Sequence, residues 1–226
     1  LIDLGYDDIL DNIVVSSNIS VVTQLNVNQR GINDLTGIED FTALTVLKCY
    51  SNQLTSLDVS NNTALTRLEC YNNPLTSLDV SSNTALTNLL CYNNQLTNLD
   101  VSNNTSLTYL RCDANQLTSL DISNNTALTG LECYTNSLTS LDVSSNTALT
   151  HLKCQTNQLT SLDVSNNTAL TWLGCFSNQL TYLNMKNGAT DQLTTFIASN
   201  NSLTCIETLD PAYATANWTS ANGNID

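Results

Sequence analysis

Two kinds of side chain with useful chemistry recur in this sequence at a constant spacing of 21 residues. The cysteines at that spacing are Cys49, Cys70, Cys91, Cys112, Cys133, Cys154 and Cys175. The aspartates at that spacing are Asp58, Asp79, Asp100, Asp121, Asp142 and Asp163. Thiols could pair as disulfides or hold zinc, and carboxylate oxygens could bind calcium. Which of these chemistries the chain can use depends on how the repeat arranges each column.

Composition argues against several other chemistries. The 226 residues carry 20 acidic and 6 basic side chains, with a formal net charge of −14. Nucleic-acid and anionic-membrane binding need clustered Lys and Arg, which are scarce here. The single histidine, His151, leaves little scope for acid–base catalysis or a multi-histidine metal site. No apolar run approaches the ~20 residues that span a bilayer. We predict no cofactor, no nucleic-acid partner and no membrane insertion.

The elements that carry these columns follow from the hydrophobic pattern of the repeated unit. Residues 44–64 read LTVLKCYSNQLTSLDVSNNTA, and near copies follow one another along the chain. Leu47 and Cys49 alternate with polar or aromatic neighbours, and Leu57 and Val59 alternate with Ser and Asp. This period of two is typical of half-buried strands. We predict an all-β-rich solenoid with two short parallel strands in each turn, in which neighbouring strands lie ~4.8 Å apart.

The repeated unit resembles the leucine-rich repeats of the short bacterial class, and residues 32–44, INDLTGIEDFTAL, resemble internalin-type repeats. The resemblance implies a right-handed coil of about eight to nine turns over residues 22–206. It also implies capped ends, which we place at residues 1–21 and at residues 207–226, the second of which looks truncated. Similar proteins are secreted or lie on the bacterial cell surface, so the resemblance implies an extracellular or cell-surface location and a protein partner.

The cysteine column is expected to pack rather than to react. Neighbouring thiols would stand on strands ~4.8 Å apart, beyond the ~3.5–4.5 Å between the Cβ atoms of a disulfide. A linear column also offers no converging ligands for zinc or an iron–sulfur cluster. We therefore predict free thiols packed as small hydrophobic groups, with Cys205 outside the column. The asparagines that share the spacing, beginning at Asn52, are expected to satisfy main-chain groups where the chain leaves the strand.

A comparison of the turns with one another separates a constant side from a variable one. The second half of the unit hardly changes, whereas the outward positions of its first strand differ from turn to turn. Recognition of an irregular partner needs such variety, and Tyr, Trp and Arg dominate binding hot spots. We predict a non-enzymatic recognition or adhesion module that binds a protein partner through this face. The candidate residues are Tyr50, Arg67, Glu69, Tyr71, Tyr92, Tyr109, Arg111, Asp113, Glu132, Tyr134, His151, Lys153, Trp172 and Phe176.

Two alternatives stay open for the same face. Aromatic rings can stack on sugar rings, which would make the chain a carbohydrate-binding module for polysaccharide. The variety could also be neutral drift on a surface that binds nothing. A pair of acids on adjacent turns, Asp113 and Glu132, could in principle cut polysaccharide. Without a cleft, however, two solvated acids have no reason for separated pKa values, so we expect no catalysis.

The aspartate column on the constant side allows two remoter functions. Stacked like charges are unfavourable, so the column needs counter-ions or hydrogen bonds. Calcium would require about six to eight converging oxygens, whereas Ser56 and Ser60 could instead donate hydrogen bonds to Asp58. The regular threonine columns could order ice-like water, although the adjacent charges oppose such a match. The acidic side chains near the N-terminus are expected to form a solvated cap surface: Asp7, Asp8 and Asp11.

Overall fold

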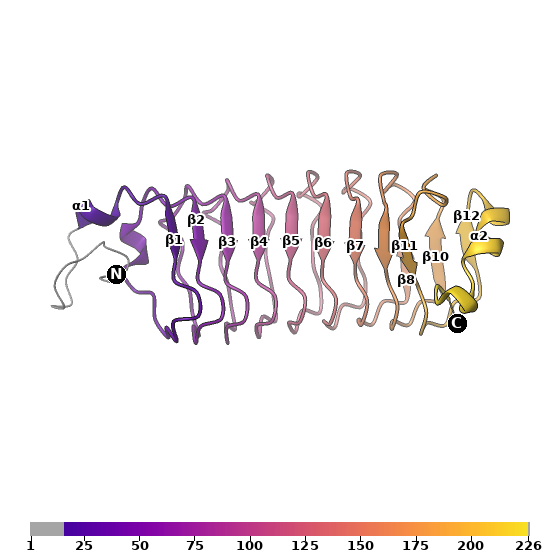
Figure 1. The fold of residues 1–226 in the computed structure, drawn as a ribbon, viewed down its shortest axis with the longest axis horizontal. Helices are drawn as coiled ribbons and strands as arrows, with labels where there is room; N and C mark the ends of the chain where they lie inside the picture. The colour runs from indigo at the N-terminus through magenta and orange to yellow at the C-terminus, as the bar shows by residue number, and fades with distance from the viewer. Residues whose placement is uncertain (1–15, 226) are drawn as a thin grey trace.

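The computed structural model describes residues 16–225 and shows a parallel-strand solenoid of about 9 turns (Figure 1). The turns follow one another along the long axis of a rod. The first strands of the turns are β1 (Gln24–Asn26), β2 (Val46–Lys48), β3 (Arg67–Glu69), β4 (Asn88–Leu90), β5 (Tyr109–Arg111), β6 (Gly130–Glu132), β7 (His151–Lys153), β9 (Trp172–Gly174) and β11 (Thr195–Ile197). They form one 9-stranded sheet in chain order. The predicted leucine-rich repeat solenoid is confirmed.

The pairing register of this sheet repeats the spacing of the sequence. Leu47 pairs with Leu68, one repeat further along the chain. The spacing between paired residues is one residue longer than 21 at the first pair of strands, from Leu25 to Leu47. It is two residues longer at the last pair, from Leu173 to Phe196. Because all these residues stay in register, the extra residues are accommodated in the connections and the inward column remains continuous.

Leucine and cysteine side chains fill the space between the two halves of each turn. Leu110 and Cys112 are fully buried, and Leu117 and Ile122 from the second half belong to the same core. Burying one such leucine side chain contributes about 2 kcal/mol, so the repeated leucines are the main source of stability. The column cysteines are free and buried, as predicted. Burial raises the pKa of Cys49 to about 12, which keeps its thiol protonated and inert.

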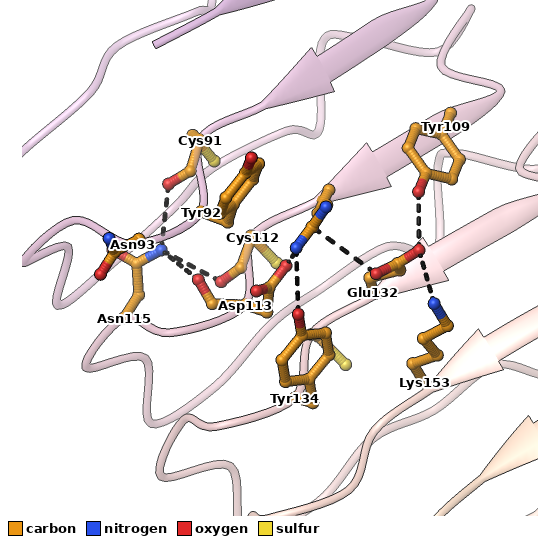
Figure 2. Close-up of polar contacts among 12 residues, drawn as sticks. Cys91, Tyr92, Asn93, Tyr109, Cys112, Asp113, Asn115, Glu132, Tyr134 and Lys153 are labelled. Atoms are coloured by element: carbon orange, nitrogen blue, oxygen red, sulfur yellow. Dashed lines mark hydrogen bonds and ion pairs between the residues drawn. The ribbon is translucent and has the colours of Figure 1, made fainter. Parts of the chain in front are cut away.

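The asparagine column closes the corner that follows each first strand. The Nδ2 of Asn115 donates to the carbonyl oxygens of Cys112 and Cys91, both at 3.1 Å (Figure 2). Its Oδ1 accepts a hydrogen bond from the Leu96 N–H at 3.0 Å. Equivalent contacts recur at Asn94 one turn earlier. Each amide therefore joins two consecutive turns, which confirms the structural role predicted for this column.

The second half of the unit departs from the prediction of two strands in every turn. Three strands pair there, namely β8 (Ser161–Asp163), β10 (Tyr182–Met185) and β12 (Ile206–Thr208), in the order β12-β10-β8. In the other described turns the only pairing of this side is an isolated bridge between Asp58 and Asp79. The prediction of a second strand is therefore correct only near the C-terminal end.

The second sheet has one cross-strand contact that the aspartates of the earlier turns lack. In those turns one aspartate follows another in the column, whereas Asn184 follows Asp163 at the C-terminal end. The Nδ2 of Asn184 donates to the Asp163 carboxylate at 3.1 Å. This hydrogen bond supports the pairing of β8 with β10.

Residues near the C-terminal end cover the last strand of the large sheet. The short helices α2 (Pro211–Asn217) and η3 (Ser220–Asn222) follow β12. The Trp218 ring packs on Phe196 with centroids 4.4 Å apart. Asn224 donates through Nδ2 to the Phe196 carbonyl and accepts from the Ala198 N–H. These contacts satisfy the edge of β11 and support, as a proposal, a cap at residues 207–226.

The first described elements are two short helices, α1 (Ser16–Ile19) and η2 (Ile38–Asp40), on either side of β1. Most of the N-terminal cap predicted for residues 1–21 lies outside the described residues, and so do the acidic side chains Asp7, Asp8 and Asp11. Between residues 16 and 225, no helix has the length and apolar character needed to cross a membrane.

Candidate binding face

The candidate residues lie on the outer side of the 9-stranded sheet or at its first corner, and they pack on one another. We call this surface the variable face. His151 is its exposed member, whereas Glu69, Asp113 and Glu132 are buried and the other candidates are half-buried. The pattern predicted outward side chains, and the structure adds that three carboxylates are covered by their neighbours.

Three tyrosines and an arginine form a continuous stack along the N-terminal half of the face. The rings of Tyr50 and Tyr71 are 4.3 Å apart between centroids and nearly parallel, at 8°. The rings of Tyr71 and Tyr92 have the same separation, at 10°. The Arg111 guanidinium carbon lies 3.7 Å from the centroid of Tyr92, a cation–π contact. The three tyrosines stack because each stands 21 residues from the next, and the strand register places residues with that spacing side by side in consecutive turns.

Arg111 also anchors a polar network in the middle of the face, and its partners Asp113, Glu132 and Tyr134 are labelled in Figure 2. Its Nε donates to Asp113 at 2.7 Å and lies 3.5 Å from Glu132. The Nη2 of Arg111 donates to the Tyr134 hydroxyl oxygen at 3.0 Å. The Tyr109 hydroxyl donates to Glu132 at 2.7 Å. Both carboxylates are therefore held in charge-assisted hydrogen bonds.

Two smaller clusters flank this network. Glu69 accepts from the Arg67 Nε at 2.6 Å, and the Lys48 ammonium lies 3.7 Å away. Lys48 was not among the predicted site residues, although its outward position on the strand was visible in the pattern. On the other side, Lys153 pairs with Glu132 at 3.1 Å and lies 5.2 Å from the ring centroid of Trp172.

Two candidates take no part in these clusters. The Nδ1 of His151 lies 2.8 Å from the Thr150 hydroxyl, and Phe176 is half-buried near the end of its column.

Two glycines that sequence reasoning did not single out make room for the large rings. A Cβ added to Gly130 would approach the Tyr109 ring to 2.6 Å, and one added to Gly174 would approach the Trp172 ring to 2.6 Å. Both glycines stand at outward positions where other turns carry larger side chains. Their small size lets the neighbouring aromatic ring lie flat on the sheet, which a comparison of columns alone could not show.

The packing of the variable face changes the ionisation of its phenols. Burial, followed by the neighbouring rings Tyr92 and Tyr50, raises the pKa of Tyr71. Burial and the hydrogen bond to Glu132 raise the pKa of Tyr109. Burial disfavours a charged Arg111, but its contacts with Asp113 outweigh this and raise its pKa. The network therefore holds neutral phenols beside a permanent cation.

We expect Tyr71 and Tyr109 to ionise later in the folded chain than in the unfolded chain. An unfolded tyrosine has a pKa of about 10. Because the folded pKa values are higher, the stability from these phenols is present below pH ~10 and is lost as the pH rises through the folded values. Absorbance of tyrosinate at 295 nm, followed with and without denaturant, measures this. The Tyr109→Phe variant should lose one late-titrating group, and an unchanged late phase would contradict the assignment.

The aspartate column on the opposite side is held by local hydrogen bonds. Asp58 Oδ1 accepts from the Ser60 N–H at 2.9 Å, and the hydrogen bonds from Ser60 lower the pKa of Asp58. The same contact recurs at Asp79, Asp100, Asp121, Asp142 and Asp163. Across residues 16–225, no group of three or more His, Cys, Asp or Glu side chains is arranged to hold a metal ion. Each aspartate of the column therefore has a hydrogen-bond donor within its own turn.

The threonine column at the corner before the first strands is similarly occupied. The Thr66 hydroxyl donates to the Thr45 carbonyl at 3.1 Å, and the Thr87 hydroxyl donates to the Thr66 carbonyl at 3.1 Å. These hydroxyl donors therefore join neighbouring turns.

No protein-family model and no curated protein matches the chain. Among solved structures, the functional domain of InlJ from Listeria monocytogenes, which includes a cysteine ladder, is 42% identical with a TM-score of 0.70. The match covers 86% of this chain and 48% of that one, so the chain spans about half of its length.

Two further leucine-rich proteins are similar. The effector YopM from Yersinia pestis is 27% identical with a TM-score of 0.69, over 82% of this chain and 51% of that one. The ectodomain of the receptor kinase GASSHO1 from Arabidopsis thaliana is 25% identical with a TM-score of 0.66, over 75% of this chain and 23% of that one. With the repeat spacing and the stacked parallel strands, the likenesses to InlJ and YopM show that the chain is a leucine-rich repeat protein of the short-repeat bacterial class.

Proposed function

We propose that the chain is a non-enzymatic recognition or adhesion module, secreted or at a bacterial cell surface, that binds a protein partner through the variable face. The packed network around Arg111 is the observation that supports this most. A face whose Tyr, Trp and Arg side chains are already held in one geometry loses little conformational entropy on binding. These residue types also dominate interface hot spots. The constant side offers no comparable variety.

The similar proteins support a partner-binding role. The GASSHO1 ectodomain was solved in complex with CASPARIAN STRIP INTEGRITY FACTOR 2, so one protein with this repeat architecture holds a partner. The likeness to InlJ supports the surface or secreted setting that the repeat type implies. Because the chain spans about half of the InlJ domain, we restrict the proposal to this module.

The geometry favours a protein partner over a sugar. The tyrosine stack uses both faces of Tyr71 and of Tyr92 on neighbouring groups. Rings in such a stack present their edges and hydroxyl groups, whereas a sugar ring packs on an open aromatic face. Trp172 is likewise covered by Lys153 on one side and rests against Gly174.

The two acids that could have served catalysis have structural partners instead. Asp113 is 2% exposed and hydrogen-bonded to Arg111. Glu132 is 8% exposed and holds both Tyr109 and Lys153. Because both carboxylates are buried and hydrogen-bonded to neighbouring side chains, we assign them as anchors of the network.

An array of purified extracellular proteins, run beside a glycan array, tests the proposal. We expect selective binding on the protein array, and at least tenfold weaker binding of the same partner by the variant Tyr71→Ala/Tyr92→Ala/Tyr109→Ala. The matched control is Asp79→Asn/Asp100→Asn/Asp121→Asn on the opposite side, which should bind as the parent does. Circular dichroism must show that both variants are folded. Selective glycan hits, or a partner that binds the tyrosine variant as tightly as the parent, would refute the proposal.

A further inference from the structure

The variable face hides its anions and exposes its cations. The side chains of Glu69, Asp113 and Glu132 are between 3% and 11% exposed. The basic side chains that pair with them are between 27% and 42% exposed, and they are Lys48, Arg67, Arg111 and Lys153. A protein with a net charge of −14 therefore presents a face on which positive groups are the accessible charges.

The accessible basic side chains also carry N–H groups beyond those that bond to the carboxylates. A guanidinium has five N–H donors and an ammonium has three, and neither accepts. Arg67 reaches Glu69 through Nε, and Lys153 reaches Glu132 through one contact of its ammonium. The remaining N–H groups of both side chains point to a ligand that brings acceptors, with carboxylates as the strongest candidates.

The residues around the variable face do not neutralise the positive charge of its basic side chains. The corner residues that follow the first strands are neutral: Ser51, Asn72, Asn93, Ala114, Thr135, Thr156 and Ser177. The aspartate column lies on the other side of the rod, and packed layers are ~10 Å apart. At physiological salt the Debye length is about 8 Å, so the charge of the aspartate column is largely screened from a ligand on the variable face.

The spacing of the cations matches an extended chain that runs along the rod. Arg67, Arg111 and Lys153 stand on β3, β5 and β7, so each is two strands from the next, or roughly 10 Å along the axis of the rod. Arg111 and Lys153 share one register position. Arg67 is in register with Tyr109, two residues before Arg111, so it stands to one side of the line through the other two. An extended polypeptide advances ~3.3 Å per residue. Acidic residues three positions apart would therefore meet the three cations in turn.

We propose that the variable face binds an acidic, extended segment of a partner protein, aligned with the axis of the rod. This inference rests on the proposed function and names the chemistry of its partner. A polypeptide fits better than an acidic polysaccharide along the tyrosine stack, because both ring faces of Tyr71 and of Tyr92 are in contact with neighbouring groups. The tyrosine hydroxyls of the stack can bond to peptide carbonyl groups between the cations.

Synthetic peptides provide the probe. One is a fluorescent 18-residue peptide of Glu-Pro-Ser repeats, and its control replaces every Glu with Gln. Anisotropy at low salt should show saturable binding of the Glu peptide to the full chain, at least tenfold weaker binding of the Gln peptide, and loss of affinity at high salt. The variant Arg67→Gln/Lys153→Gln should bind the Glu peptide at least tenfold more weakly. Lys186→Gln removes a cation that pairs with Glu207 away from the variable face and should change affinity less than twofold.

Three results would overturn the inference: no saturable binding of the Glu peptide, equal binding by the double variant, or tighter binding of a heparin fragment than of the Glu peptide. Its failure can be told apart from failure of the proposed function. If the Glu peptide does not bind but the tyrosine variant still loses a partner found on the protein array, the face is the binding site and only the acidic chemistry is wrong.

Discussion

Replacing Arg111 with methionine is expected to lower the free energy of unfolding by about 3 kcal/mol. Methionine keeps much of the apolar stem but removes the cation from Asp113, whose side chain is 3% exposed. A buried carboxylate without its partner is strongly unfavourable. The same change removes the hydrogen bond to Tyr134 and the cation–π contact with Tyr92. Urea unfolding followed by circular dichroism measures the loss.

The matched control for this variant is Arg67→Met. Arg67 also bonds to a buried carboxylate, but it is more exposed, and Glu69 keeps Lys48 nearby. We expect a loss of about 1 kcal/mol or less. Adding Asp113→Asn to Arg111→Met should restore part of the stability, because the buried charge is then gone. Equal losses for Arg111→Met and Arg67→Met, without recovery in the double variant, would show that Asp113 does not depend on Arg111.

Replacing Asn94 with alanine is expected to cost about 3–5 kcal/mol, because several buried main-chain groups lose their partners at once. The amide of Asn94 donates to the carbonyls of Cys91 at 2.9 Å and Cys70 at 3.2 Å, and accepts from the Leu75 N–H at 3.2 Å. In a solenoid each turn is stabilised by its two neighbours. Losing Asn94 should therefore weaken the interface between its own turn and the preceding turn, which contains Cys70 and Leu75.

The adjacent Gln95 provides the control for this prediction. Its side chain is exposed, and the Gln95 N–H donates to the Leu75 carbonyl whichever side chain is present. Gln95→Ala should change stability by less than about 0.5 kcal/mol. Thermal and urea unfolding of both variants compare the two sites. If Asn94→Ala were as stable as Gln95→Ala, water or neighbouring groups would be satisfying the carbonyls, and the asparagine column would not hold the corners together.

Much of the fold could be predicted from the sequence because the repeat shows which positions are equivalent. Leu47 and Cys49 alternate with outward residues, and a period of two in a unit that recurs many times predicts stacked strands. The role of Asn52 and its counterparts followed from the same reasoning, because a polar residue at a constant corner position must satisfy something there. The internal comparison of turns also identified the variable face.

Other features were decided by contacts between turns. The corners contain residues with positive φ that are not glycine, including Thr135 at 52° and Thr156 at 55°. Threonine avoids this conformation, so no local signal predicts it, and only the stacking of neighbouring corners enforces it. The second strand of each turn was predicted from its alternation alone, but paired strands form only near the C-terminal end, where Asn184 follows Asp163 and donates a hydrogen bond to it.

The binding face shows the same division most clearly. The sequence by itself determined that varied aromatic and charged residues share one surface of a stacked solenoid, because periodicity assigns each position to a side. Only the tertiary structure decided that Tyr50, Tyr71 and Tyr92 stack beneath the Arg111 guanidinium, and that the carboxylates are covered while the cations stay accessible. The physical reason is that the ring stack, the contact of Arg111 with Tyr92 and the hydrogen bonds of Glu132 to Tyr109 and Lys153 join residues of different turns. The geometry of these contacts depends on strand register and on the size of the neighbouring side chain, and a column of residue types does not specify how those side chains pack.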